Sequence, residues 1–293
     1  MAEVTVFLNG KLLPLEQATV SVLDRGFMFG DGVYEMVPAY SRVPFRLDEH
    51  LARLERSLGE TQIRNPYSRT QWRSHIYQLI DAQPFEDQGI YFQVTRGAAK
   101  RDHAFPKGVE PTVFMMSNPL TNPPPAQVEQ GGVALSALDN RWLRCDIKSI
   151  SLIGNCLLRQ ISAEADASET ILFRDGKLTE ASSSNVFIVK RGVVQSPPKS
   201  NLILPGITYD VVVELARANN LPLELRDIAE SEVRSADEVW VTSSSKEVLA
   251  IVELDGKRIG DGRPGPVFRR MYQLYQEFKQ KVMRAGKREA VSA

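Results

Sequence analysis

Apolar side chains recur along the chain with two different periods, which predicts a protein of mixed strands and helices. Residues 4–8 and 11–13 are short apolar runs on either side of an Asn-Gly pair, which favours the tight turn of a β-hairpin. Leucines between 51 and 58 recur at helical spacing, and Asp48 before them is the predicted N-cap. The same reasoning predicts strands at 33–40, 89–95, 112–117, 132–138, 170–173, 186–189 and 238–242, and helices at 70–81, 153–165, 207–218 and 266–283.

A proline-rich stretch near the middle of the chain interrupts these patterns. Prolines deny the backbone the donors and dihedral angles of a helix or central strand, and a surface loop is the alternative to a linker. We predict a small N-terminal α/β domain at 1–118, a linker at 119–126, a larger C-terminal α/β domain at 127–283 and a disordered tail at 284–293. The predicted fold class is therefore α/β (α+β) with two domains.

Composition and charge narrow the function classes. The 36 lysines and arginines balance 36 aspartates and glutamates, which argues against binding nucleic acid or an anionic membrane through bulk charge. No apolar run reaches the ~18 residues that span a bilayer, and the N-terminus has no signal-peptide pattern. Two cysteines, Cys145 and Cys156, and three histidines give no disulfide framework and no metal-binding cluster. We expect a cytoplasmic protein without a structural metal.

Two segments hold side chains suited to chemistry on a ligand. In FGDGVYE, residues 29–35, small side chains leave room for a ligand beside the hydroxyl of Tyr34, although glycines more often mark an ordinary turn. Lys148 follows a segment otherwise fit for burial. A lysine drawn inward loses hydration, which favours the neutral, nucleophilic amine of Schiff-base chemistry. The alternative is an ammonium group that faces water.

Three further segments could contact a flat or anionic ligand. The sequence TEASSSN places Glu180 among small residues, where its carboxylate could pair with a protonated ring nitrogen, and a serine-rich loop is the alternative. LPGIT enters a predicted helix, so the amides of Ile207 and Thr208 would be free to bind phosphate. The serines of TSSS, residues 242–245, could also contact phosphate. Ordinary capping is the alternative at both places.

The order of these segments resembles the fold-type IV family of pyridoxal-phosphate enzymes. That family contains D-amino-acid transaminases, branched-chain aminotransferases and aminodeoxychorismate lyases. The resemblance covers nearly the whole chain and rests on the combination of RGFMFGDGVYE (25–35) with EASSSN (180–185). The RDH element at 101–103 and RWLRCDIKS at 141–149 are most similar to the D-amino-acid transaminases. The resemblance implies two domains with an active site between them, near a dimer interface.

The resemblance also implies pyridoxal 5'-phosphate as the cofactor and assigns residues to it. Lys148 would hold the cofactor covalently and later shuttle a proton, and Glu180 would favour a protonated ring nitrogen. The residues that would bind its phosphate are Arg53, Ile207, Thr208, Ser243 and Ser244.

The substrate carboxylate would, by the same resemblance, be bound by Tyr34, Arg101 and His103, because a guanidinium fork matches a carboxylate. Without the family context, a solvated loop arginine and a loop-packing histidine are the alternatives for the last two. Tyr209 stands where the nearest relatives commonly carry arginine, and Met36 lies on the strand after Tyr34. These departures bear on the surroundings of the phosphate and of the substrate.

The implied activity is transamination between a D-amino acid, such as D-alanine or D-glutamate, and a 2-oxo acid, such as 2-oxoglutarate or pyruvate. The implied assembly is a homodimer. A branched-chain L-amino-acid aminotransferase and an aminodeoxychorismate lyase are alternatives on the same scaffold. A non-catalytic pyridoxal-phosphate-binding protein is an alternative from a different class, disfavoured by the presence of both Lys148 and Glu180.

Overall fold

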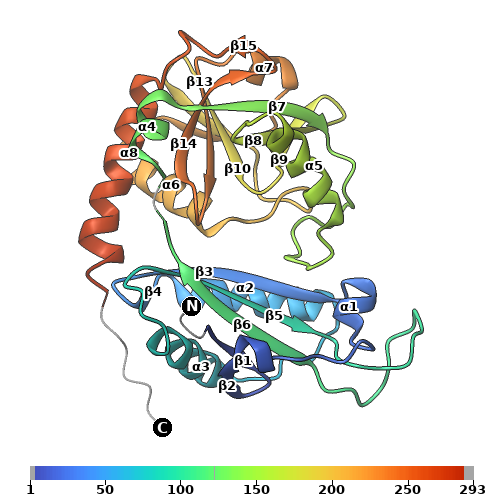
Figure 1. The fold of residues 1–293 in the computed structure, drawn as a ribbon. Coiled ribbons are helices and arrows are strands. Elements are labelled where there is room, and N and C mark those ends of the chain that lie inside the picture. The colour runs from blue at the N-terminus through green and yellow to red at the C-terminus, as the bar shows by residue number, and fades with distance from the viewer. Residues whose placement is uncertain (1–3, 122, 287–293) are drawn as a thin grey trace. The chain divides into compact units, whose positions relative to one another are not determined.

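A computed structural model of the protein describes residues 4–121 and 123–286 (Figure 1). Most of the predicted tail, and Asn122 in the predicted linker, lie outside the described residues. The chain forms two compact units. The first comprises Met1–Thr121, Ile147–Leu152 and Val282–Ala293, and the second comprises Asn122–Asp146 and Ile153–Lys281. These units differ from the predicted domains because residues 147–152, which include Lys148, belong to the first unit.

The first unit is built on a six-stranded antiparallel sheet with the strand order β2-β1-β6-β5-β3-β4. Helices α2 and α3 pack against it, and the leucines of α2 join the strands in one buried core. The elements are β1 Thr5–Leu8, β2 Lys11–Pro14, η1 Leu15–Gln17, α1 Arg25–Phe29, β3 Gly32–Tyr40, β4 Val43–Pro44, α2 Leu47–Glu60, α3 Arg69–Asp81, β5 Gln88–Thr95 and β6 Thr112–Pro119.

Local sequence explains most of these boundaries. The predicted hairpin is confirmed, and Asn9 and Gly10 take the positive φ angles, 47° and 90°, that the tight turn requires. The predicted N-cap was wrong, because Arg46 occupies that position and Asp48 lies in the first turn of α2, where a carboxylate still favours the helix dipole. The glycine-rich segment contains the short helix α1, which Asp24 caps by accepting a 2.8 Å hydrogen bond from Gly26 N.

The second unit is built on a nine-stranded mixed sheet, ordered β12-β11-β10-β13-β14-β7-β8-β9 with β15 beside β14. Helices α6 and α8 contact each other and β13, and α5 packs on β7 and β8 (Figure 1). The predicted α/β (α+β) class with two units is confirmed. The elements are α4 Pro125–Gln130, β7 Gly132–Leu138, α5 Ile153–Glu164, β8 Glu169–Arg174, β9 Lys177–Ala181, β10 Asn185–Lys190, β11 Val193–Ser196, α6 Ile207–Ala218, β12 Leu223–Leu225, α7 Glu230–Arg234, β13 Glu238–Ser243, β14 Glu247–Leu254, β15 Lys257–Arg258, α8 Pro266–Phe278 and η2 Lys279–Met283.

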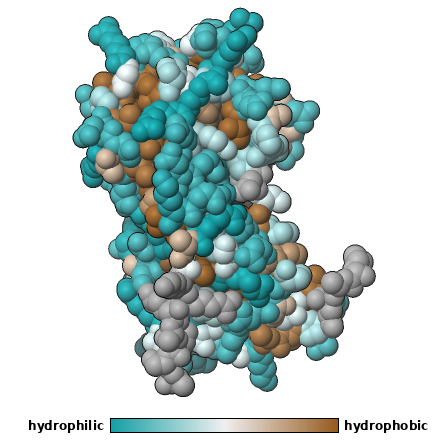
Figure 2. Space-filling model, turned by 90° about the vertical axis from the view of Figure 1, so that its left-hand side faces the viewer, coloured by the Kyte–Doolittle hydropathy of each residue, from teal (hydrophilic) through white to brown (hydrophobic). Residues whose placement is uncertain are grey.

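Two helices of the second unit present opposite kinds of surface. The exposed positions of α8 are mainly polar, such as Arg270 and Gln273, and the side of the unit that carries α8 is largely hydrophilic in Figure 2. On α5 the apolar repeat predicted from the sequence is exposed: Ile153 is 73% and Leu157 64% accessible. The periodicity therefore identified the helix, but the apolar stripe is not core in the single chain.

No helix of the described residues is long and apolar enough to cross a membrane.

Candidate active site

Lys148 lies in the segment that joins the first unit through β3 and α2. Its carbonyl oxygen accepts a 2.9 Å hydrogen bond from Tyr34 N, and its amide donates to Ser57 Oγ on α2 over 3.3 Å. Ser149 forms an isolated bridge with Val33 on β3. These backbone contacts fix the Lys148 Cα beside the start of β3.

The side chain of Lys148 is half-buried and runs over the ring of Tyr34, with Nζ 4.2 Å from the ring centroid. The Tyr34 ring in turn lies 5.5 Å from the ring of Tyr91. Among the residues that the structure describes, no carboxylate pairs with the Lys148 amine. An amine held by aromatic packing rather than by an acid is suited to attack a carbonyl carbon, which fits an aldehyde cofactor.

Arg53 is held by a buried carboxylate one position along β3 from Tyr34. Its Nε and Nη2 donate to the two oxygens of Glu35, each over 2.7 Å, and His50 Nδ1 lies 2.7 Å from the same group. Burial alone would raise the pKa of Glu35, but Arg53 and His50 outweigh it and hold the pKa well below its usual range. Arg53 and Ser57 are four residues apart on α2, so the arginine lies one turn from the Lys148 backbone.

Two of the three residues of the RDH element, Arg101 and His103, lie on an exposed loop after β5 and contact the ring of Phe29. The guanidinium carbon of Arg101 is 5.2 Å and the His103 ring centroid 5.7 Å from the Phe29 centroid. Within the described residues, no hydrogen bond, ion pair or ring contact joins either of them to Tyr34. The structure thus brings Arg101 and His103 together and does not bring Tyr34 to them.

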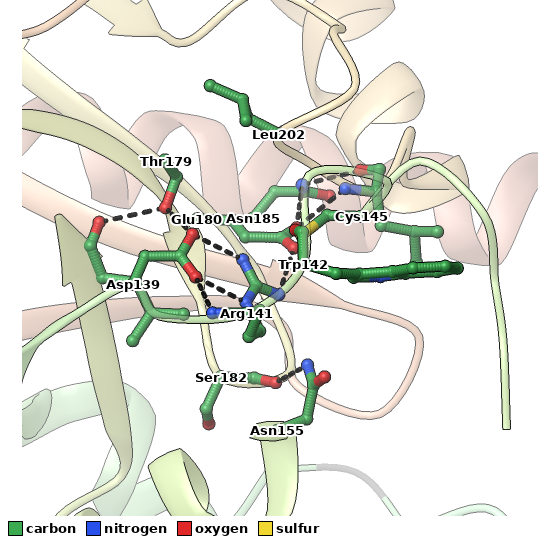
Figure 3. A network of polar contacts seen from close by, with 12 residues as sticks. Asp139, Arg141, Trp142, Cys145, Asn155, Thr179, Glu180, Ser182, Asn185 and Leu202 are labelled. Carbon is green, nitrogen blue, oxygen red and sulfur yellow. Dashed lines mark hydrogen bonds and ion pairs between the residues drawn. The ribbon is translucent and has the colours of Figure 1, made fainter. Parts of the chain in front are cut away.

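Glu180 lies at the end of β9 in a buried polar network of the second unit (Figure 3). Its Oε1 accepts a 2.7 Å hydrogen bond from Arg141 Nη1, and its Oε2 accepts from the amide of Leu204 over 3.0 Å. Arg141 is shared, because it also donates to both oxygens of Asp139. Burial raises the pKa of Glu180 to about 7, against the lowering effects of Arg141 and the Leu204 amide.

The predicted phosphate-binding residues of the second unit lie around Asn185, at the start of β10. Asn185 pairs with Thr242 on β13, next to Ser243 and Ser244. Its side chain donates 2.9 Å to Leu204 O, and a Cβ on Gly206, the N-cap of α6, would lie 2.1 Å from its Oδ1. The start of α6 therefore lies beside the end of β13.

The place where the start of α6 meets Asn185 and the end of β13 has free hydrogen-bond donors and little room for larger side chains. Among the described residues no side chain caps α6, so the amides of Ile207 and Thr208 point out of the helix start. Thr242 Oγ1 is buried and has no hydrogen-bond partner within residues 4–121 and 123–286. A helix N-terminus beside small hydroxyl residues is suited to an anionic group such as a phosphate monoester. The residues of the second unit thus fit the phosphate and ring of the cofactor that the sequence implied.

Tyr209 and Met36, the two departures from the family pattern, lie in different surroundings. Tyr209 points into the core of the second unit, where its hydroxyl donates to Pro197 O over 3.0 Å and its ring lies 5.0 Å from that of Phe187. Its position on α6 therefore changes packing behind the helix start rather than the donors at it. Met36 is half-buried on β3 and shares a face with Tyr34, two residues earlier.

Sequence reasoning missed the partners of the candidate residues. Glu35 and His50 hold Arg53, and Arg141 holds Glu180, yet none was assigned a role. The available signal was Glu35 itself, a charged residue on the strand face opposite Tyr34, where burial demands a partner. For Arg141 the signal was weaker, since it lies 39 residues from Glu180 along the chain.

A family model for amino-transferase class IV matches residues 32–254 of the chain. The D-alanine aminotransferase of Bacillus licheniformis is 41% identical over 271 residues, which cover 92% of this chain and 95% of that protein. The D-alanine aminotransferase of Listeria monocytogenes (strain 10403S) is 38% identical over 283 residues, 96% of both chains.

Solved structures show the same fold. The branched-chain amino acid aminotransferase of Escherichia coli superposes with a TM-score of 0.86, over 98% of this chain and 97% of that chain, at 23% identity. A second branched-chain enzyme, solved with pyridoxamine 5'-phosphate, gives a TM-score of 0.87 over 94% of each chain at 24% identity. At these identities the similarity establishes the fold alone. The two kinds of comparison therefore agree on the architecture, and the matches of higher identity are to D-alanine aminotransferases.

Proposed function

Because the chain belongs to the class IV aminotransferases, we propose that it transfers the amino group of a D-amino acid to a 2-oxo acid with pyridoxal 5'-phosphate as cofactor. D-alanine or D-glutamate would be the donor, and 2-oxoglutarate or pyruvate the acceptor. The membership predicted from the sequence is confirmed. The observation that carries the proposal is the 41% identity to a D-alanine aminotransferase across 92% of the chain.

Pyridoxal phosphate supplies, when bound, a ring that withdraws electrons from the substrate Cα–H bond. Lys148 would hold the cofactor, and its Nζ would take the proton from the substrate Cα. Tyr34 supports this role because its ring packs on the lysine chain and limits where the amine can point. Because the Lys148 amine is not paired with a carboxylate of the described residues, no ion pair has to break before it reacts.

Glu180 is the residue that we assign to the cofactor ring nitrogen. Because its pKa is about 7, the Glu180 carboxyl is close to half protonated at neutral pH. A protonated ring nitrogen placed against it would act as a second positive partner beside Arg141 and would lower that pKa. The carboxylate would then stabilise the cation that it faces, which keeps the ring an effective electron acceptor.

For the phosphate we assign Ile207, Thr208, Ser243 and Ser244, which the Asn185 contacts gather, together with Arg53. The first four offer backbone amides and hydroxyls without net charge. Arg53 adds a positive charge, and its bidentate pairing with Glu35 fixes the direction of its guanidinium group. The orientation comes from the pairing, so Arg53 needs no reordering when an anion approaches.

Arg101 and His103 are our proposed ligands of the substrate carboxylate. We assign Tyr34 to the same carboxylate on the family resemblance alone, because no contact among the described residues joins it to these two. Both loop residues are exposed and contact the ring of Phe29, so a carboxylate can reach them. A carboxylate held at one fixed point relative to the cofactor decides which substituent of Cα faces Lys148. Selection of the D-enantiomer would then follow from geometry.

We further propose a homodimer in the cytoplasm. Exposed apolar side chains gather on α5 and the segment before it, where water would be expelled by a second copy. They are Leu138, Trp142, Leu143, Ile153 and Leu157. Light scattering on the purified protein would give twice the chain mass, and Leu157→Asp with Ile153→Asp would give the single-chain mass. Cell fractionation tests the location.

A half-reaction tests the activity. The purified holoenzyme is mixed in separate cells with D-alanine, L-leucine and aminodeoxychorismate while the visible spectrum of the cofactor is followed. We expect fast bleaching with D-alanine alone and formation of pyruvate. Bleaching with L-leucine alone would establish a branched-chain enzyme instead, and pyruvate from aminodeoxychorismate without an amino acceptor would establish a lyase.

A further inference from the structure

The connection between β5 and β6, residues 96–111, carries Arg101 and His103 and contains no helix or strand. Connections of this length without a helix or strand are uncommon in compact domains, and function is one reason for them. Its base is fixed by backbone contacts, since residues 97–99 pair with 23–25 through hydrogen bonds of 2.9 and 3.1 Å. The outer part, residues 100–111, is mostly exposed and makes no such backbone pairing within the described residues. Other groups must therefore hold it.

Arg25, buried at 3% exposure, reaches the outer part with its side chain. Its Nη1 donates to Asp102 O over 2.5 Å and its Nη2 to His103 O over 3.5 Å, while its Nε donates to Asp31 over 2.7 Å. Asp102 lies directly between Arg101 and His103. The guanidinium group thus fixes the backbone at the point from which both candidate carboxylate ligands extend.

Arg96 holds another part of the same loop. Its Nε and Nη2 donate to Asp31 over 2.8 and 3.0 Å, and it also donates to the carbonyl groups of residues 61 and 62. Its guanidinium carbon lies 3.6 Å from the ring centroid of Phe105. One carboxylate, Asp31, therefore aligns two guanidinium groups, each of which contacts a different part of the loop.

The ring of Phe29 links this cluster to the candidate ligands. The guanidinium carbon of Arg25 lies 4.7 Å from its centroid, on the same ring that Arg101 and His103 contact. Phe29 itself ends α1, the helix that begins with Arg25. A displacement of Arg25 would therefore reach Arg101 and His103 through the loop backbone and through the ring.

We propose that Arg25 and Arg96, aligned by Asp31, are positioning residues that set the geometry of the substrate-carboxylate site. The inference rests on the proposed function, in which Arg101 and His103 bind that carboxylate. Lysine cannot replace Arg25, because one ammonium nitrogen cannot reach Asp31 and two carbonyl oxygens in different directions. The cluster shares no residue with the proposed cofactor site, so cofactor binding should not depend on it.

Steady-state kinetics of Arg25→Lys test the proposal. We expect KM for D-alanine to rise by about tenfold, the equivalent of one charge-assisted hydrogen bond, with kcat and cofactor affinity within about twofold of wild type. The matched control is Arg42→Lys. Arg42 likewise donates to three backbone carbonyls, those of Ile80, Gln83 and Phe85, but far along the chain from this loop. Its KM should not change.

A second readout is independent of activity. Trypsin cleaves after Lys100 and Arg101 once the loop can enter the protease, so Arg25→Lys should be cut there several times faster than wild type and than Arg42→Lys. Phe105→Ala, at an exposed position, removes only the ring on Arg96 and should give the same changes with smaller size. It also serves if Arg25→Lys does not fold.

The outcomes separate the two proposals. If Arg101→Ala raises KM but Arg25→Lys and Phe105→Ala change neither KM nor the rate of cleavage, the positioning role is wrong and the carboxylate site stands. If Arg101→Ala leaves KM unchanged, the carboxylate site itself is wrong, and the inference falls with it. Equal weakening of D-alanine use and of cofactor affinity in Arg25→Lys would show a general structural role and would also overturn it.

Discussion

The two units each bury a glutamate against an arginine, and their pKa values are shifted in opposite directions. In the first unit, Glu35 receives two donors of Arg53 and a contact from His50, and its pKa lies below its usual range. In the second unit, Glu180 receives a single arginine donor from Arg141, and burial raises its pKa to about 7. Burial opposes ionisation in both.

The difference is in how many donors each carboxylate receives and whether its arginine is shared. Glu35 has Arg53 as an ion-pair partner and His50 as a further hydrogen-bond partner, and both lower its pKa. Glu180 shares Arg141 with Asp139, which raises the pKa of Glu180 further. A carboxylate that is fully paired with its own arginine can hold that arginine in place. A carboxylate that shares its arginine can still pair with a positively charged group of a ligand. This suits Glu35 to positioning and Glu180 to the ring nitrogen.

The largest expected effect comes from breaking the compensated pair. Arg53→Met leaves Glu35 buried without its arginine partner and should lower the free energy of unfolding by about 3–5 kcal/mol at pH 7. Urea unfolding of the cofactor-free protein measures it. The double variant Glu35→Gln with Arg53→Met, which removes both charges, should recover at least half of the loss. Equal losses in the single and double variants would contradict the compensation.

A smaller effect is expected from Glu180→Gln, as a change in pH dependence. In the unfolded chain Glu180 ionises near 4.5, and in the folded chain near 7, so the folded state holds the extra proton between these values. Stability should therefore fall as pH rises from 4.5 to 7, by about 1–3 kcal/mol from this group. Glu180→Gln should remove that fall.

The measurement is the difference in unfolding free energy between wild type and Glu180→Gln, followed from about pH 5 to about pH 8 without cofactor. His50, whose pKa burial lowers, contributes a rise over an overlapping range, but it is present in both proteins and cancels. A difference that stays constant over this range would show that Glu180 is ionised throughout.

The smallest effect sharpens the comparison. Asp139→Asn takes away the carboxylate that competes for Arg141, so the pKa of Glu180 should fall toward its ordinary value. The pH midpoint of the Glu180→Gln difference, measured in the Asp139→Asn background, should move to lower pH. A midpoint that stays in place would mean that sharing of Arg141 does not explain the contrast with Glu35.

The sequence predicted the elements with strong periodicity because their cause is local. The predicted strand at 132–138 and helix at 207–218 coincide with β7 and α6. The same periodicity on α5 identified the helix but not what covers its apolar stripe, since period reports a face and not its partner. No strand was predicted around Glu180, whereas Glu180 lies on β9, a short strand whose formation depends on pairing with β8.

The candidate site was predictable by motif and not by partner. Lys148 and Glu180 stand in recognisable segments, so their types and spacing were enough to single them out. The contacts that hold the candidate site residues and their loop join residues distant in the chain: Arg141 lies 39 residues from Glu180, and Asp102 lies 77 from Arg25. Such pairs depend on the tertiary fold, and no local pattern encodes them.

The claim on which the account depends most is that Lys148 holds the cofactor. Borohydride reduction of the holoenzyme, followed by digestion and peptide mass spectrometry, would locate the cofactor on the chain. We expect it on the peptide that contains Lys148, and we expect Lys148→Ala to lose both the visible absorbance of the cofactor and transamination. Cofactor found on another lysine, with Lys148 unmodified, would contradict the account.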